Sequence, residues 1–206
     1  MDLRKRLAGV RTGFTNRLAG IRRVLGKDDV RALARRYFVA NGFDGTLTST
    51  GVVVGAVLAG QDSGFAVIAI GLGAAVGLGT SGIWSVWEIE RAETSREREK
   101  IESAMLTTLA DTRYSRDLRN EQIVLSLSAA TGPVLGILIT LIPFLFEGTL
   151  LSMTQAAVLS VALGVCLLGS IGAYMGHISK QRWYIAAIRM GLAGIVVAGL
   201  TVLLPG

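Results

Sequence analysis

The chain has 206 residues, of which 51% are hydrophobic and 17% charged, and its formal net charge is +6. A soluble domain usually carries about 25% charged residues. Between Gln122 and His177 the sequence contains a single charge, Glu147. A water-soluble fold would leave such a stretch with an exposed apolar face, so the composition excludes an ordinary soluble domain. It predicts an all-α, polytopic membrane protein.

The first 36 residues are a basic segment with eleven of the 21 Lys and Arg residues. The sequence of Arg6–Arg11 recurs at Arg17–Arg22, eleven residues later, so both copies share one helical face. An apolar stripe flanked by arginines results, formed by Leu7, Val10, Phe14, Leu18 and Ile21. We predict an amphipathic helix on the anionic inner leaflet, with a flexible basic tail as the alternative. The segment is too polar for a cleavable signal peptide. Membrane topology accounts for its charge without nucleic acid as a partner.

Five apolar stretches follow, each close to the roughly 17–25 residues that a membrane-spanning helix needs. They are Tyr37–Gly60, Phe65–Trp87, Ile123–Phe146, Gln155–His177 and Tyr184–Leu204. The first is the weakest, because Asp44 interrupts it. Residues 88–102 contain neither Gly nor Pro, so we expect the second helix to extend into the cytoplasm. Residues 37–206 would thus form a five-helix transporter domain, with residues 88–122 as a Glu-rich cytoplasmic helical insert.

The basic residues predict the orientation. Besides the N-terminal eleven, seven lie in Glu88–Gln122, and three are Lys180, Arg182 and Arg189. The connections Gln61–Gly64 and Glu147–Thr154 contain none. Five spans therefore place every basic residue on one side, which the positive-inside rule makes cytoplasmic. The N-terminus would be cytoplasmic and the C-terminus outside, in the cell membrane if the source is prokaryotic.

Asp44 is the most informative residue of the first apolar stretch. A charged side chain deep in a bilayer costs about 2.5–3.5 kcal/mol on insertion scales, so it should face a cavity, a partner or an ion. A carboxylate suits a hard divalent cation and can also hold a proton. Asn41 precedes it, and the hydroxyls of Thr46, Thr48 and Thr50 follow. The alternative is that Asp44 caps the first helix at the membrane interface.

The segment after the second stretch is rich in glutamate. Glu90, Glu93 and Glu97 fall within one narrow helical stripe, whereas Glu88, Glu99 and Glu102 lie on the opposite side. Like charges four residues apart destabilise a bare helix, and a bridging cation would remove that repulsion. The alternative is a solvated helix with local ion pairs such as Glu93–Arg96 and Glu97–Lys100.

Other chemistry is sparse in this sequence. Met153, Met175 and Met190 are candidate soft ligands, although methionine is also a common packing residue. Pairs of glycines four residues apart, Gly51/Gly55, Gly73/Gly77 and Gly172/Gly176, favour close helix packing in lipid. The sequence contains no Walker motif, catalytic triad pattern or Cys-x-x-Cys, so we do not expect an enzyme.

Three stretches resemble the vacuolar iron transporter family, whose members move Fe²⁺ or Mn²⁺ out of the cytosol in exchange for protons. They are Asn41–Gly55 with its Asp-Gly and Thr-rich run, Gly71–Glu102, where a glycine-rich helix passes into a Glu-rich one, and Leu167–Gly194. The inner half of the second helix departs from the family, because it lacks the methionine and glutamate often found there.

The resemblance implies particular roles. Asp44 would be the family's intramembrane aspartate on the ion path, and Glu90, Glu93 and Glu97 would be metal ligands. From the residues themselves, we further predict that Asn41, Thr48 and Glu88 line the ion path and that Met175 is a soft ligand. The resemblance also implies a homodimer with the path between the first helices, and the metal ion as cargo with no permanently bound cofactor. Two alternatives stay open. One is a non-transporting membrane scaffold whose Glu-rich helix docks a partner, and the other is a transporter of a different small solute.

Overall fold

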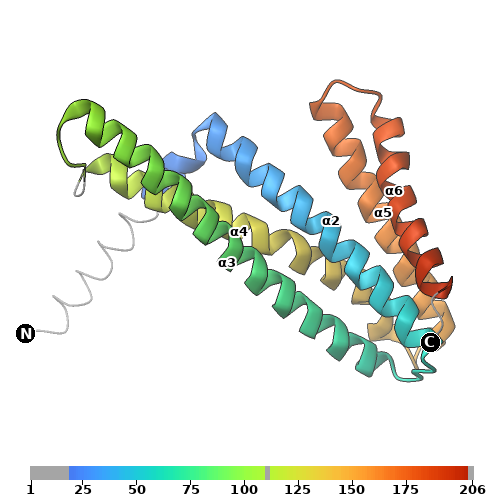
Figure 1. Ribbon diagram of the computed structural model, residues 1–206. Helices are drawn as coiled ribbons and strands as arrows, with labels where there is room; N and C mark the ends of the chain where they lie inside the picture. Colours follow the sequence, from blue (N-terminus) through green and yellow to red (C-terminus); the bar gives the residue numbers. More distant parts are fainter. Residues whose placement is uncertain (1–18, 110–111, 204–206) are drawn as a thin grey trace, which may run out of the picture. The chain divides into compact units, whose positions relative to one another are not determined.

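The computed structural model describes residues 19–109 and 112–203, where every regular element is a helix (Figure 1). Residues 19–25 are helical. They are followed by α2 (Asp28–Leu58), α3 (Gly64–Met105), α4 (Arg113–Leu141), the 3₁₀-helix η1 (Ile142–Phe146), α5 (Met153–Ile178) and α6 (Trp183–Leu203). The all-α class predicted from composition is therefore confirmed. The predicted amphipathic stripe of the N-terminal segment falls mostly on residues 1–18, outside the described residues.

Four helices are long and apolar enough to cross a membrane: α3, α4 with η1, α5 and α6. Helix α2 has the length but does not reach the same hydropathy. Its predicted span contains Asp44 together with Asn, Thr and Ser residues, which lower the mean hydropathy. The four helices make this an integral, multi-pass membrane protein, and α2 as a fifth span stays a prediction.

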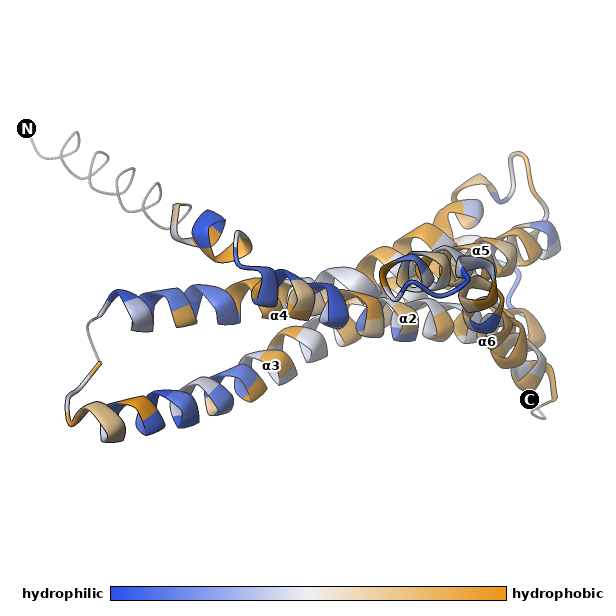
Figure 2. Cartoon of the chain, turned by 90° about the horizontal axis from the view of Figure 1, so that it is seen from above, coloured by the Kyte–Doolittle hydropathy of each residue, from blue (hydrophilic) through white to orange (hydrophobic). Residues whose placement is uncertain are grey.

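Helix α3 continues without interruption through the glutamate-rich segment to Met105. Its polar C-terminal half and the polar start of α4 are hydrophilic in Figure 2, whereas the remainder of both helices is largely hydrophobic. That this polar half lies in the cytoplasm stays a prediction. At the other end of the chain, α5 begins with a capping box: Ser152 accepts a hydrogen bond from the backbone of Gln155, whose side chain bonds the Ser152 backbone in return.

The chain folds into two compact units, which we describe separately. One comprises the described part of Met1–Tyr37 together with Gly82–Ser128, and the other comprises Phe38–Ser81 with Ala129–Gly206 as far as the described residues reach. The first unit contains the polar parts of α3 and α4, and the second contains most of the apolar sequence. The boundary thus falls close to the change from polar to apolar sequence within α2, α3 and α4.

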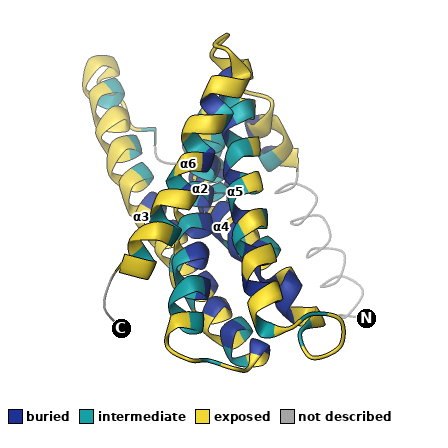
Figure 3. Ribbon diagram, turned by 90° about the vertical axis from the view of Figure 1, so that its right-hand side faces the viewer, coloured by how far each residue is buried: buried dark blue, intermediate teal, exposed yellow. Residues whose placement is uncertain are grey.

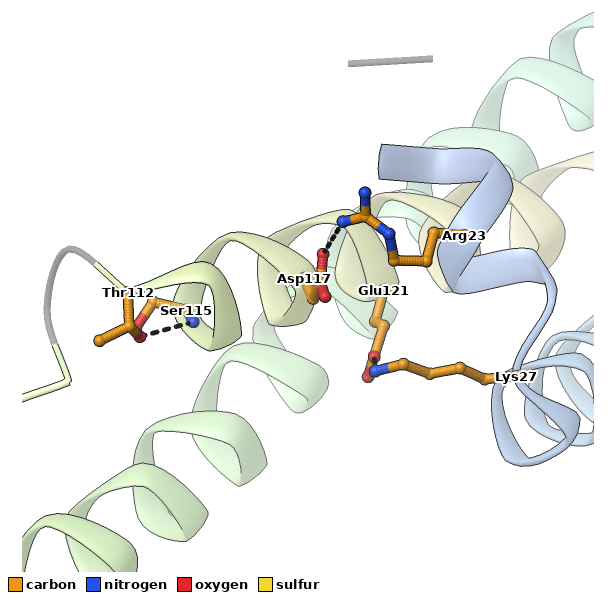
Figure 4. Close-up of polar contacts among 6 residues, drawn as sticks. All are labelled: Arg23, Lys27, Thr112, Ser115, Asp117 and Glu121. Atoms are coloured by element: carbon orange, nitrogen blue, oxygen red, sulfur yellow. Dashed lines mark hydrogen bonds and ion pairs between the residues drawn. The ribbon is translucent and has the colours of Figure 1, made fainter. Parts of the chain in front are cut away.

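Two ion pairs join the start of the described chain to α4 in the first unit (Figure 4). Lys27 Nζ lies 2.5 Å from Glu121 Oε1, and Arg23 Nη1 lies 3.5 Å from Asp117 Oδ1. All four residues are partly exposed, so these pairs orient the segment before α2 more than they stabilise it.

In the second unit, α2 and α4 cross in backbone contact. A Cβ atom on Gly45 would stand 2.4 Å from Pro133 Cα, and one on Gly132 would stand 2.3 Å from the Phe38 carbonyl oxygen. Real side chains do not fit at such distances, so only glycine permits this approach. Small residues that let helix backbones touch are a main source of helix association in lipid, where the hydrophobic effect between helices is absent.

The predicted glycine pairs have different surroundings. Gly172 lies against α6, where an added Cβ would stand 2.5 Å from the Ala186 carbonyl oxygen, and Gly176 packs similarly tightly. In contrast, Gly73 and Gly77 on α3 face open space, with no described atom within 4 Å of an added Cβ. The four-residue spacing therefore predicted close packing correctly on α5 but not, within this single chain, on α3.

Much of the apolar surface faces outward. Helices α3 and α6 present broad exposed faces (Figure 3). Large exposed side chains on them include Phe65, Val76, Trp84, Ile195 and Leu203. Exposed apolar area on this scale exceeds what a soluble monomer carries and suits contact with lipid. Helix formation pairs the backbone groups within a span, as the bilayer requires, although Pro133 inside α4 has no N–H to donate.

Candidate functional site

Three of the predicted path residues share one face of α2. Asn41, Asp44 and Thr48 are three and four residues apart, which places them within one helical stripe. Asp44 and Thr48 are exposed, and Asn41 is half-buried. The stripe belongs to the second unit and lies in the predicted first span, so a polar surface interrupts an apolar helix.

Asp44 does not cap a helix. Helix α2 begins at Asp28, not at the predicted span boundary of Tyr37, and Asp44 therefore lies in its interior. An interior position leaves the carboxylate no free backbone N–H groups to accept from. The capping interpretation is wrong, and the reason is that the helix starts in the preceding basic segment.

The three alternating threonines that follow Asp44 do not share one face of α2. Thr46 and Thr50 are buried, and their hydroxyls donate to the carbonyl oxygens of Gly42 and Thr46 at 2.8 and 2.9 Å. Successive alternate residues are about 200° apart around an α-helix, so an alternating run cannot share a face. Thr48 alone of the three lies with Asp44.

Asp44 makes no hydrogen bond or ion pair within the described part of the chain. A bare carboxylate facing lipid would carry the insertion cost of about 2.5–3.5 kcal/mol. A charge at such a position pairs with another group or faces a bundle interior or a water-filled cavity. If α2 spans the membrane as predicted, its exposed face would require cover that the described residues do not provide.

The predicted glutamates of α3 have mixed surroundings in the first unit. Glu90 is half-buried and accepts a hydrogen bond of 2.8 Å from the Tyr37 hydroxyl. Glu97 accepts a longer one, 3.4 Å, from the hydroxyl of Tyr114. Glu93 is exposed and has no partner among the described residues. Glu88 lies 3.5 Å from Arg91.

These glutamates do not converge on a single point within this chain. The described residues contain no group of three or more His, Cys, Asp or Glu side chains placed to hold a metal ion. The expected local pairs Glu93–Arg96 and Glu97–Lys100 are also absent from the described residues, where the ion pairs on this helix are Glu88–Arg91 and Arg98–Glu102. Metal binding by Glu90, Glu93 and Glu97 stays a prediction. The half-buried Met175, near the end of α5, stays a predicted soft ligand.

Sequence reasoning missed a set of buried hydroxyls. The hydroxyl oxygens of Ser49 and Thr140 lie 2.5 Å apart, and Ser160 donates to the Thr140 carbonyl oxygen at 2.6 Å. They link α2, α4 and α5 in the second unit. In the first unit, Ser126 is 2% exposed and its hydroxyl lacks a hydrogen-bond partner among the described residues. Small polar residues at three- and four-residue spacings within apolar helices are the signal that would have indicated this set.

The fold and this polar stripe define a multi-pass helical membrane protein with an exposed carboxylate in the interior of α2. A sequence model of the VIT family matches residues 84–205, more than half of the chain. The chain therefore belongs to the VIT family, a family of transporters, which indicates transport of metal ions across a membrane. The protein MJ0645 of Methanocaldococcus jannaschii, described as uncharacterized, is 28% identical to it over 167 residues, covering 79% of this chain and 84% of the relative.

Proposed function

We propose that the protein exports Fe²⁺ or Mn²⁺ from the cytosol in exchange for protons. The observation that supports this most directly is the exposed carboxylate of Asp44 inside α2, with Asn41 and Thr48 on the same face. Carboxylate, amide and hydroxyl oxygens are ligands for hard divalent cations. Membrane metal transport follows from the family, and the ion, the exchange and the direction are our proposal.

Exchange follows from the chemistry of one carboxylate. The ionised form of Asp44 binds the cation, and the protonated form does not, because both ligands compete for the same oxygen atoms. Metal entering from the cytoplasmic side displaces a proton from the site, and a proton arriving from the other side displaces the metal. The site would thus carry metal in one direction and a proton in the other, and this couples the two fluxes.

A homodimer would complete the site. If two copies place the outer faces of α2 against one another, each covers the other's Asp44 from lipid. The pairing would also bring two carboxylates, two amides and two hydroxyls to one path, enough oxygen ligands to replace most of a hydrated ion's water. Because a divalent cation neutralises two carboxylates, the loaded path would carry little net charge through the bilayer.

The glutamates of α3 would collect metal on the cytoplasmic side. Glu93 is exposed and makes no ion pair or hydrogen bond with the described residues, and the Glu90 carboxylate accepts a hydrogen bond from Tyr37 of α2. Glu88 and Glu97 would assist collection, and Met175 would favour a softer ion such as Fe²⁺.

A flux assay tests the proposal. Full-length protein is reconstituted in liposomes, and Fe²⁺, Mn²⁺, Co²⁺ and Zn²⁺ are supplied in turn under an imposed pH gradient. The movements of metal and of protons across the membrane are recorded together. We expect Asp44→Asn, which removes the charge at nearly constant volume, to abolish metal flux and coupled proton release. The matched control is Asp62→Asn, an exposed carboxylate in the connection before α3.

The outcomes separate the functions. Flux of wild-type size in Asp44→Asn with intact folding would contradict the assignment of the site. Absence of flux in the wild type for all four metals, together with no metal binding by calorimetry, would favour the non-transporting scaffold.

A further inference from the structure

The first unit contains a cleft of about 600 Å³ between α3 and α4. Its walls carry four arginines, Arg91 and Arg98 from α3 and Arg116 and Arg119 from α4. Trp87, Leu118 and uncharged polar side chains complete the lining, and no acidic residue is among the described residues that line it. This is a concentrated positive surface, distinct from the glutamate stripe of α3.

The arginines retain donors for a ligand. Arg91 makes a 3.5 Å contact with Glu88, and Arg98 makes a 3.4 Å contact with Glu102. Each contact involves a single guanidinium nitrogen, whereas a guanidinium carries five N–H donors. Arg119 is exposed and has no acidic partner in the described part of the chain. Close positive charges repel one another, so an anion in the cleft would lower the electrostatic energy.

The cleft also has an ordered polar wall. Gln122 is nearly buried, and its amide donates to the Thr94 hydroxyl at 2.6 Å, which joins α4 to α3. The same Thr94 hydroxyl donates to the Glu90 carbonyl oxygen at 2.7 Å. These bonds fix the spacing of the two helices that carry the arginines, so the cations are held apart at a set distance.

The cleft lies at the end of two predicted spans. Trp87, which lines it, is the last residue of the second apolar stretch, and Gln122 precedes the third. Tryptophan is enriched at membrane–water interfaces, where lipid phosphates are found. Basic pockets at the cytoplasmic ends of membrane helices suit acidic headgroups.

We propose that this cleft binds a phosphate group, carried either by the headgroup of an acidic phospholipid or by a small soluble phosphate. Guanidinium groups bind phosphate oxygens in bidentate fashion, and arginines on facing helices can grip one phosphate from two sides. The arginines repel cations, so the cleft is not a second metal site. A bound phosphate would join α3 to α4 beside the glutamate-bearing half of α3.

The test uses full-length protein in a non-ionic detergent. Dioctanoyl phosphatidylglycerol, dioctanoyl phosphatidylcholine and inorganic phosphate are titrated separately, and binding is followed by the rise in thermal unfolding midpoint and by tryptophan fluorescence. The test variant is Arg98→Gln with Arg119→Gln. The control, Arg96→Gln with Arg113→Gln, removes the same charge from the same two helices outside the cleft.

We expect phosphatidylglycerol to bind more tightly than phosphatidylcholine, and the test variant to weaken that binding by at least about tenfold, with the control near wild type. Binding of phosphatidylglycerol without inorganic phosphate identifies a lipid site, and binding of both identifies a general phosphate site. If the test variant does not fold, Arg98→Lys with Arg119→Lys keeps the charge and should still weaken binding, because lysine cannot bind bidentately. Equal weakening by test and control variants, or no binding of either phosphate ligand, would overturn the proposal.

Discussion

Both faces of α2 carry polar residues, but those on one face are buried and hydrogen-bonded, whereas those on the other are exposed. On the inner face, Thr46 and Ser49 are buried and hydrogen-bonded, and Gly45 touches α4. On the outer face, Asp44 and Thr48 are exposed, and Asp44 has no partner in the described part of the chain. One helix therefore has a polar face that the fold satisfies and a polar face that it leaves open.

The difference suggests a way to distinguish polar side chains that stabilise a membrane helix from polar side chains that serve its function. In lipid, no water is present to satisfy an open polar group, so each such group must find a partner or a passing ligand. Hydroxyls that already bond within the chain contribute to helix packing. A carboxylate with no partner is instead available for cargo, and substitutions on the two faces should separate stability from transport.

Gly45→Val should have the largest effect on the inner face. Its Cβ would stand 2.4 Å from Pro133 Cα, where no flexible side chain can move aside, so the helices must separate. We expect a loss of about 3 kcal/mol or more, visible as a large fall in the thermal unfolding midpoint or as failure to recover monodisperse protein. Gly73→Val, where no described atom lies within 4 Å, is the control and should fold normally. Equal stability of the two variants would mean that the α2–α4 contact does not support the fold.

Thr48→Val and Thr50→Val form an isosteric pair that tests the faces directly. We expect Thr48→Val to lower metal flux about tenfold, the loss of one ligand or hydrogen bond to a charged group, with unchanged thermal stability. Thr50→Val removes a buried hydroxyl that bonds its own helix, so it should change stability slightly and leave flux intact. The comparison of faces fails if the two variants exchange these effects.

Ser49→Ala should have a moderate effect on stability alone. It removes the hydroxyl contact with Thr140, worth about 1 kcal/mol between membrane helices. A double-mutant cycle with Thr140→Val measures the coupling, and Ser170→Ala, whose exposed hydroxyl bonds its own helix, is the control. Strictly additive single and double variants would show that the contact contributes nothing to helix association.

The helical class and the spans from α3 to α6 could be predicted because apolar length alone requires a bilayer and a bilayer requires helices. The position of Asp44 on a stripe with Asn41 and Thr48 follows from helical periodicity in the same way. Of the three threonines after Asp44, the same periodicity places only Thr48 on its face. Thr46 and Thr50 are buried, with the Thr46 hydroxyl beside Gly136 of α4 and the Thr50 hydroxyl beside Gly164 of α5.

Contacts between distant segments could not be predicted from local patterns. The Tyr37 hydroxyl reaches Glu90 across 53 positions of sequence, and no periodicity encodes that pairing. The arginine cleft likewise combines residues from two helices whose register is set by packing and by the bond between Gln122 and Thr94. The pattern within one helix predicts which residues share a face. Which faces of different helices come into contact is determined by packing.

Lys27→Met should have the smallest effect of these substitutions. Asp44 is a charge without a partner among the described residues, whereas Lys27 is a paired charge in contact with water. An ion pair in water adds little to the free energy of unfolding. The hydrogen bond from the Lys27 ammonium to Glu121 raises the pKa of Lys27 above its ordinary value of 10.5. A raised folded-state pKa means that the stabilisation is fully present below pH 10.5 and is lost as pH rises through the folded-state pKa. Because the Lys27 side chain is 46% exposed, screening by solvent keeps this contribution well below about 1 kcal/mol. The unfolding midpoint of the wild type should therefore exceed that of Lys27→Met slightly at pH 8, and the gap should close as the pH rises through the folded-state pKa or in about 1 M salt. Lys100→Met, an exposed lysine on α3 outside any ion pair of the described residues, provides the control. A gap that widens with rising pH would contradict the pairing of Lys27 with Glu121.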